Sequence, residues 1–467
     1  MYIIRFIIWL EILIAMTITT SAQSSVVLES TQLKKGDTCI FYGYLNGNIT
    51  RGDTILIQTA GRLELSSKTP LPQGQYILQT PKQIYNGMIE LLIEKSNSNV
   101  LKISHDSLYN SISFKDNPVN GVYSAYLGSV RATENQIQKL YAKVNLTTPL
   151  ENREKISREI KEHQKRLYDL ENSIIKRYPN TLLSAIVSCN NLPLMSGSIL
   201  DNYMSDSNSA LYKQTTKFLR DNYFKGVDFH SDVLLNTSLV PFKIKKYISL
   251  FDKNDPELDD VVKELLQKSA VNPLMYQVVS DALYTIFHQS LYTNNNENIM
   301  IDILKNAKQQ SFVPDWKKQS ITQQILIYQK NKVGTQAANL NLKDFGDKEY
   351  LLNNVKSKYT ILYFYDPECS NCSEITPKMK GWFYVDGPKN ATILAIYINQ
   401  DEQEWSNYIR ENTYPPRWIN LWDKNESDKM REKYWIESLP AIYVLDENKK
   451  VILKNVNFKQ LIKYFSK

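Results

Sequence analysis

Cysteine and histidine are scarce in this sequence. Its 467 residues include only four cysteines, Cys39, Cys189, Cys369 and Cys372, and only four histidines. So few cysteines exclude a disulfide-stapled scaffold, and the fold must therefore depend on apolar burial. The histidines lie far apart in the chain, which argues against a histidine-rich metal site. We accordingly expect no metal ion.

Glycine, proline and blocks of like charge are also rare. The 15 glycines and 17 prolines fall well below the usual share of about 12%, which excludes collagen-like and linker-dominated chains. The net charge of +7 is spread along the chain, and no basic block predicts nucleic-acid binding. At roughly 150 residues per domain, the length suggests about three globular domains.

Long apolar runs are missing except at the amino terminus. Arg5 precedes an apolar stretch from Phe6 to Ile18, which Glu11 interrupts, and small residues follow up to Ala22. This pattern predicts a signal peptide, residues 1–22. The run is short for a bilayer span of about 20 residues, and an uncleaved anchor is the alternative. We therefore expect an exported, periplasmic protein with no membrane span in its mature form.

Along the rest of the chain, the predicted type of secondary structure changes twice. Short β-branched and aromatic runs separated by turn residues predict a β-sandwich domain in residues 23–128. Helical periodicity then predicts a helical domain in residues 129–332, which opens with a helical hairpin at 131–177. A helix that ends near Lys332, followed by a possible C-cap at Gly334, marks the next boundary.

Residues 337–467 alternate between strand and helix. Strands are predicted at 359–365, 391–398, 441–445 and 450–453, with helices after the first strand, at 402–411 and at 458–465. This order is a βαβ unit followed by a ββα unit. The predicted fold class is therefore multidomain α+β, with a β-sandwich, a helical middle region and a carboxy-terminal α/β domain.

The segment Cys369-Ser370-Asn371-Cys372 lies where the first of these strands passes into a helix. Unpaired N–H groups and the helix dipole favour a thiolate at Cys369, and Cys372 lies one turn later, where it can resolve a mixed disulfide. Half of a zinc site is one alternative, although it needs two more ligands. A purely structural disulfide is another, although so short a loop adds little stability. We predict Cys369 and Cys372 as catalytic residues whose redox-active disulfide takes the place of a cofactor.

The carboxy-terminal domain resembles the thioredoxin superfamily. The strand–Cys369-x-x-Cys372–helix order, Pro377 within that helix, and Ser438-Leu439-Pro440-Ala441 before a strand carry the resemblance. It implies that Pro440 follows a cis peptide bond and that Leu439 and Pro440 bind the extended backbone of a substrate.

This sequence departs from thioredoxin itself near the cysteines. Tyr363 stands where thioredoxin has a buried, proton-accepting aspartate, and Asp366, Glu368 and Glu374 bring negative charge towards Cys369. We expect this charge to favour a reducing or isomerising dithiol over a strong oxidant. A peroxidase is disfavoured, because it needs threonine at the position of Asp366.

The whole chain resembles exported bacterial thioredoxin-like proteins of the TlpA kind, which have an all-β amino-terminal domain and a helical middle domain. The stretch Phe229–Leu235 contributes to this resemblance. It implies a thiol-disulfide oxidoreductase that acts on protein disulfides or dithiols and exchanges electrons with an upstream redox partner. The alternative is a non-catalytic binding or scaffold protein. Cys39 and Cys189 are predicted to be buried free thiols, with a disulfide between them as the alternative.

Overall fold

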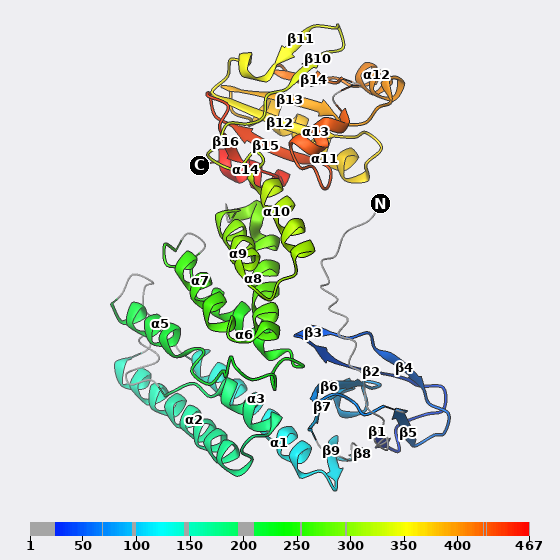
Figure 1. Ribbon diagram of the computed structural model, residues 1–467, viewed down its shortest axis with the longest axis vertical. Coiled ribbons are helices and arrows are strands. Elements are labelled where there is room, and N and C mark those ends of the chain that lie inside the picture. Colours follow the sequence, from blue (N-terminus) through cyan, green and yellow to red (C-terminus); the bar gives the residue numbers. More distant parts are fainter. Residues whose placement is uncertain are drawn as a thin grey trace. The chain divides into compact units, whose positions relative to one another are not determined.

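The computed structural model describes residues 24–466 except 68, 96–99, 144–148, 195–209, 253–254, 295–296, 424 and 426 (Figure 1). The chain forms two compact units that divide between Lys243 and Ile244. The predicted signal peptide, residues 1–22, lies outside the described residues. Within the described part of the chain, no helix is long and apolar enough to cross a membrane.

The first unit begins with two packed β-sheets (Figure 1). Their strands are β1 (Ser24–Glu29), β2 (Thr38–Leu45), β3 (Asn48–Ile49), β4 (Asp53–Leu56), β5 (Arg62–Ser67), β6 (Gly74–Gln79), β7 (Met88–Ile93), β8 (Val100–Asp106) and β9 (Ser111–Lys115). One sheet has the order β5-β1-β8-β9, and the other has the order β3-β2-β6-β7 with β4 paired to β2. Both sheets contribute to one hydrophobic core, with Leu28 from β1 and Leu78 from β6. The predicted β-sandwich is therefore confirmed.

The helices of the first unit begin earlier than the sequence analysis predicted. They are α1 (Pro118–Tyr141), α2 (Leu150–Arg177), α3 (Leu182–Asn190) and α5 (Ala210–Asn222). Helix α1 starts within the stretch assigned to the β-sandwich. The Asn117 side chain caps it by accepting a hydrogen bond from the N–H of Asn120, and Pro118 occupies a favourable position in its first turn.

Helices α1 and α2 form the predicted hairpin. Leu140, near the end of α1, and Ile160 of α2 share a small core. The Tyr126 hydroxyl, earlier in α1, donates a hydrogen bond of 3.1 Å to Glu171, later in α2. The two helices therefore run antiparallel. Glu171 is buried, and this burial raises the pKa of its carboxyl to about 7 despite the opposing effect of the Tyr126 hydrogen bond.

Replacing Glu171 by glutamine is expected to stabilise the protein above pH 7. The carboxyl keeps its proton up to a pKa of about 7 when folded but ionises near 4.5 when unfolded. The folded state binds more protons between these values, so stability falls as the pH rises through them. This loss is about 3 kcal/mol, and the glutamine variant avoids it. Thermal unfolding at pH 4.5 and pH 8 checks this.

The exposed Glu154→Gln change in the same helix serves as the control and should leave the pH dependence of unfolding unaltered. If Glu171→Gln loses as much stability between the two pH values as the wild-type protein, the assignment of this loss to Glu171 is wrong.

Residues 235–238 tie the later part of the first unit to the β-sandwich. The N–H of Gln75 donates to the carbonyl of Asn236 at 2.9 Å, and the N–H of Gly47 donates to the carbonyl of Leu235 at 2.7 Å. A Cβ atom at Gly74 would lie 2.8 Å from the Asn236 carbonyl oxygen. Glycine is therefore required at position 74 for the two segments to approach so closely.

The second unit contains both helices and the α/β domain. Helix α6 (Leu239–Ile248) spans the division between the units, and α7 (Leu258–Ser269), α8 (Pro273–Asn294), α9 (Glu297–Gln309) and α10 (Asp315–Gln329) follow. Helix α10 ends at Gln329 rather than near Lys332. Gly334 is not its C-cap, because it lies in a later turn with a φ of 86° and donates its N–H to the carbonyl of Val451.

The α/β domain is built on a five-stranded sheet with the order β14-β13-β12-β15-β16. Its elements are β10 (Asn341–Lys343), β11 (Glu349–Leu351), β12 (Tyr359–Tyr365), α11 (Ser370–Val385), β13 (Ala391–Tyr397), α12 (Glu402–Glu411), β14 (Trp418–Leu421), α13 (Ser427–Lys433), β15 (Ala441–Leu445), β16 (Val451–Leu453) and α14 (Phe458–Phe465). The predicted strands and helices are all present. Strand β14, helix α13 and the β10–β11 hairpin were not predicted, because such short elements show too little periodicity.

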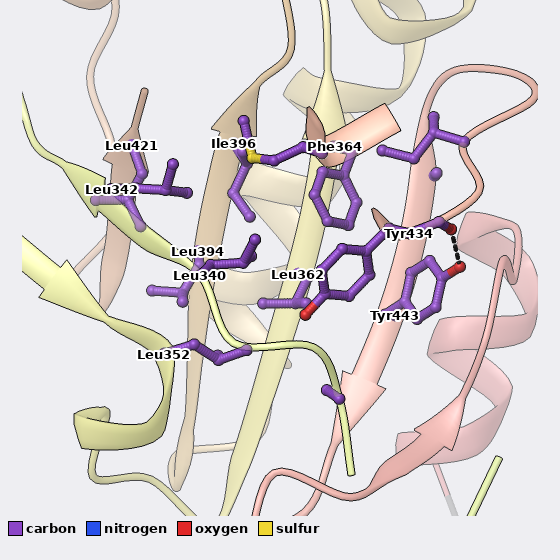
Figure 2. Packing of buried hydrophobic residues seen from close by; sticks show 14 of the residues in the cluster. Leu340, Leu342, Leu352, Leu362, Phe364, Leu394, Ile396, Leu421, Tyr434 and Tyr443 are labelled. Atoms are coloured by element: carbon purple, nitrogen blue, oxygen red, sulfur yellow. Dashed lines mark hydrogen bonds between the residues drawn. The ribbon is translucent and has the colours of Figure 1, made fainter. Parts of the chain in front are cut away.

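Alternate residues of β12 enter two different cores. Leu362 and Phe364 belong to one core, and Tyr363 and Tyr365 belong to the other, together with Cys372 of α11. Figure 2 shows the first core, whose labelled residues also include Leu340, Leu342, Leu352, Leu394, Ile396, Leu421, Tyr434 and Tyr443. Because successive strand residues point to opposite faces, Tyr363 lies on the face that α11 covers.

Candidate functional site

The two predicted reactive cysteines lie at the junction of β12 and α11. Cys369 is the N-cap residue of α11, with backbone angles φ −71° and ψ 118°. Its side chain makes no capping hydrogen bond, and the free N–H groups of the first helical turn favour negative charge here. Cys369 is partly exposed, so the sulfur of a substrate can reach it.

Cys372 differs from Cys369 in its burial. Its exposed fraction is only 1%. Burial raises the pKa of the Cys372 thiol to about 12; a side-chain hydrogen bond with Cys369 also raises it, whereas a backbone hydrogen bond at Asp366 lowers it. The motif therefore joins an accessible sulfur to a buried, protonated one.

Leu439 and Pro440 lie beside Cys369. The Cys369 Sγ donates a hydrogen bond to the Leu439 carbonyl oxygen at a distance of 3.7 Å. The Leu439–Pro440 peptide bond is cis, as the resemblance implied. The fold thus brings together the four predicted site residues from segments 70 positions apart. Their roles in catalysis and in substrate binding stay predictions.

A family model described as thioredoxin-like matches residues 357–451. This range includes Cys369, Cys372 and the Leu439–Pro440 bond. The carboxy-terminal domain belongs to the thioredoxin-like family. No curated protein matches the chain.

Several solved structures are similar to parts of the chain. A domain of a possible thiol-disulfide isomerase from Cytophaga hutchinsonii has 31% identity and a TM-score of 0.27, and the match covers 29% of this chain and 90% of that one. A conserved protein of unknown function from Bacteroides fragilis has 32% identity and a TM-score of 0.25, over 28% of this chain and 97% of that one. A thioredoxin-like protein from Bacteroides caccae has 19% identity and a TM-score of 0.48, over 59% of this chain and 97% of that one.

Hydroxyl groups lie behind Cys372 in the thioredoxin-like domain. Thr376 Oγ1 donates to the Cys372 carbonyl oxygen at 2.7 Å, and Tyr363 Oη lies 2.7 Å from Thr376 Oγ1. Burial raises the pKa of Tyr363 and of Tyr408; a hydrogen bond with Thr376 lowers the pKa of each, and negative charge on Cys372 raises both. Neither Thr376 nor Tyr408 was predicted from the sequence. The four-residue spacing of Thr376 from Cys372 could have indicated the first, whereas Tyr408 comes from another helix and no local pattern marks it.

Acidic side chains lie close to the cysteine pair. Burial raises the pKa of Glu404, and the nearby charges of Asp366 and Glu368 raise it further, although a hydrogen bond from Tyr397 lowers it. Glu374 instead forms an ion pair of 2.6 Å with Lys378, whose hydrogen bond lowers the pKa of Glu374. Asp366 and Glu368 therefore lie close enough to Glu404 for their charges to act on its carboxylate. The charge of Glu374 is instead balanced by Lys378.

The other two cysteines lie in the first unit. Cys39 of β2 and Cys189 of α3 are buried free thiols, as predicted. Burial raises the pKa of each thiol to about 11, so both are poor nucleophiles near neutral pH. Across the described ranges, no cluster of three or more metal-ligating side chains occurs.

Proposed function

We propose that this protein is an exported thiol-disulfide oxidoreductase that exchanges disulfides with protein substrates through Cys369 and Cys372. One observation carries the proposal: the partly exposed Cys369 is the N-cap residue of α11, and the buried Cys372 follows one turn later. An exposed sulfur can meet a substrate, whereas a buried sulfur can react only with its neighbour. The export and the periplasmic location rest on the predicted signal peptide, residues 1–22.

The proposed reaction has two exchange steps. In the first, the Cys369 thiolate attacks a substrate disulfide, forms a mixed disulfide and releases one substrate sulfur as a thiolate, which takes up a proton. In the second, Cys372 loses its proton and attacks the Cys369 sulfur. The Cys369–Cys372 disulfide forms, and the second substrate sulfur leaves as a thiolate, which takes up a proton in place of the one that Cys372 lost. The substrate gains two electrons, and an upstream redox partner restores them to the cysteine pair.

The segment at Leu439 and Pro440 would hold the substrate during these steps. The Leu439 carbonyl lies beside the Cys369 sulfur, and both Leu439 and Pro440 are partly exposed. An extended substrate backbone can add to such a segment through main-chain hydrogen bonds, which recognise a chain without requiring one particular sequence.

Insulin reduction tests the proposal. With dithiothreitol as the electron source, the full-length protein should precipitate the insulin B chain at least about tenfold faster than dithiothreitol alone. The Cys369→Ser variant should fall to the background rate, because it lacks the attacking thiolate. The matched Cys189→Ser variant removes a buried thiol outside the motif and should keep the wild-type rate. A wild-type rate equal to the background would overturn the proposal and favour the scaffold alternative.

A further inference from the structure

A chain of hydrogen bonds links β12 to the backbone of Cys372. A carbonyl oxygen can only accept a hydrogen bond, so the Thr376 hydroxyl donates its one hydrogen to the Cys372 carbonyl oxygen. Thr376 Oγ1 must then accept from Tyr363 Oη, 2.7 Å away. The direction of the chain is therefore settled: Tyr363 donates to Thr376, and Thr376 donates to Cys372.

The turn of α11 that this hydrogen-bond chain reaches lacks one of its own backbone hydrogen bonds. Pro377 lies inside α11 and has no N–H, so the carbonyl of Ser373 lacks the donor that a helix normally supplies. The hydroxyl chain attaches at the adjacent carbonyl, that of Cys372. It adds an anchor from the central strand at the point where the helix loses an internal hydrogen bond.

Packing holds the Tyr363 ring in place independently of its hydroxyl. The ring stacks on Tyr365 with a centroid distance of 5.6 Å and meets Trp418 edge-on at 5.9 Å. Strand β12 is itself paired on both sides, with β13 and β15. A phenylalanine at position 363 can keep these contacts, so the hydroxyl can be removed with little other change.

We propose that Tyr363 and Thr376 are positioning residues for Cys372, which fix the first turn of α11 so that its buried sulfur can attack Cys369 in the second exchange step. This inference rests on the proposed function. Because burial keeps Tyr363 protonated, it anchors the turn without placing a negative charge beside the Cys372 thiolate. The first exchange step uses only the partly exposed Cys369 and does not depend on this anchor.

A reagent with coloured leaving groups separates the two steps. When 5,5′-dithiobis(2-nitrobenzoate) is mixed with the reduced full-length protein, attack by Cys369 releases one thionitrobenzoate. Attack by Cys372 then releases the second. In Tyr363→Phe the first phase should stay within about twofold of wild type, and the second should slow by about tenfold or more. A general loss of stability would not slow the second phase while leaving the rate of the first unchanged.

Matched variants distinguish a positioning role of the hydroxyl groups from a general effect on folding. Thr376→Val removes the middle hydroxyl and should also slow the second phase, whereas Thr376→Ser keeps the hydroxyl and should retain the wild-type rate. Tyr365→Phe is the control, because its hydroxyl takes no part in the chain. If Tyr363→Phe does not fold, the two Thr376 variants still decide the question.

The outcomes distinguish this inference from the proposed function. If the wild-type protein fails to release two equivalents, the proposed function itself fails. If the wild type shows both phases but Tyr363→Phe and Thr376→Val leave the second unchanged, the positioning role is overturned. Equal slowing of both phases would also overturn it.

Discussion

The Cys372→Ser variant is expected to become trapped as a covalent adduct with a disulfide substrate. Cys369 can still attack, because it is partly exposed and lies at the N-cap of α11. The second step cannot follow, because serine has no thiolate to displace the substrate. With oxidised glutathione as the probe, intact-protein mass spectrometry should show one glutathionyl group on Cys369 as the main species. The wild-type protein should show only traces of this adduct, because Cys372 removes it.

Two controls locate the reaction. The Cys369→Ser variant should form no adduct, because the remaining thiols are buried. Adding Cys39→Ser to Cys372→Ser should leave the adduct unchanged, since Cys39 lies in the core of the β-sandwich. An adduct on any cysteine other than Cys369, or none at all on Cys372→Ser, would contradict the assigned order of attack.

Removing Lys454 is expected to destabilise the second unit strongly. Lys454 Nζ pairs with Glu297 Oε1 at 2.6 Å, and the two side chains are only 5% and 3% exposed. Lys454 also donates to the carbonyl of Lys330, and Glu297 accepts from the N–H of Val333. Lys454→Met would leave the Glu297 carboxylate buried without its cation. Breaking such a pair typically costs about 3–5 kcal/mol, which urea unfolding followed by circular dichroism would measure.

The double variant Lys454→Met, Glu297→Leu sharpens this test. It removes both charges, so most of the lost stability should return, because an apolar pair needs no compensating partner. Lys450→Met is the matched control: Lys450 is exposed, and its loss should change stability by less than about 0.5 kcal/mol. If Lys454→Met is as stable as this control, the buried pair does not anchor α9 to the α/β domain.

Local patterns were sufficient to predict the main elements and the cysteine pair. The continuous apolar and aromatic run of β12 and the strand-to-helix position of Cys369 are properties of neighbouring residues, and they indicated the α/β domain directly. The start of α1 was missed, although Asn117 and Pro118 form a recognisable helix start, because the strand pattern was extended too far.

Features that join distant segments could not be predicted in this way. No spacing rule pairs Glu297 with Lys454, because their contact depends on how α9 packs against the end of β16. The same is true of Tyr408, which reaches the neighbourhood of Cys372 from α12. Contacts of this kind follow from sheet order and helix packing rather than from local propensity.

By itself, the sequence determined that two of the four cysteines stand at a strand-to-helix junction and that the other two lie within apolar runs, because burial and helix capping act locally. The arrangement of the pair instead depends on how the strands and helices pack. This packing left Cys369 accessible beside the Leu439 carbonyl, buried Cys372, and placed the Tyr363 hydroxyl behind Thr376. The physical reason is that β12 is the central strand: its pairing with β13 and β15 fixes which of its side chains meet α11.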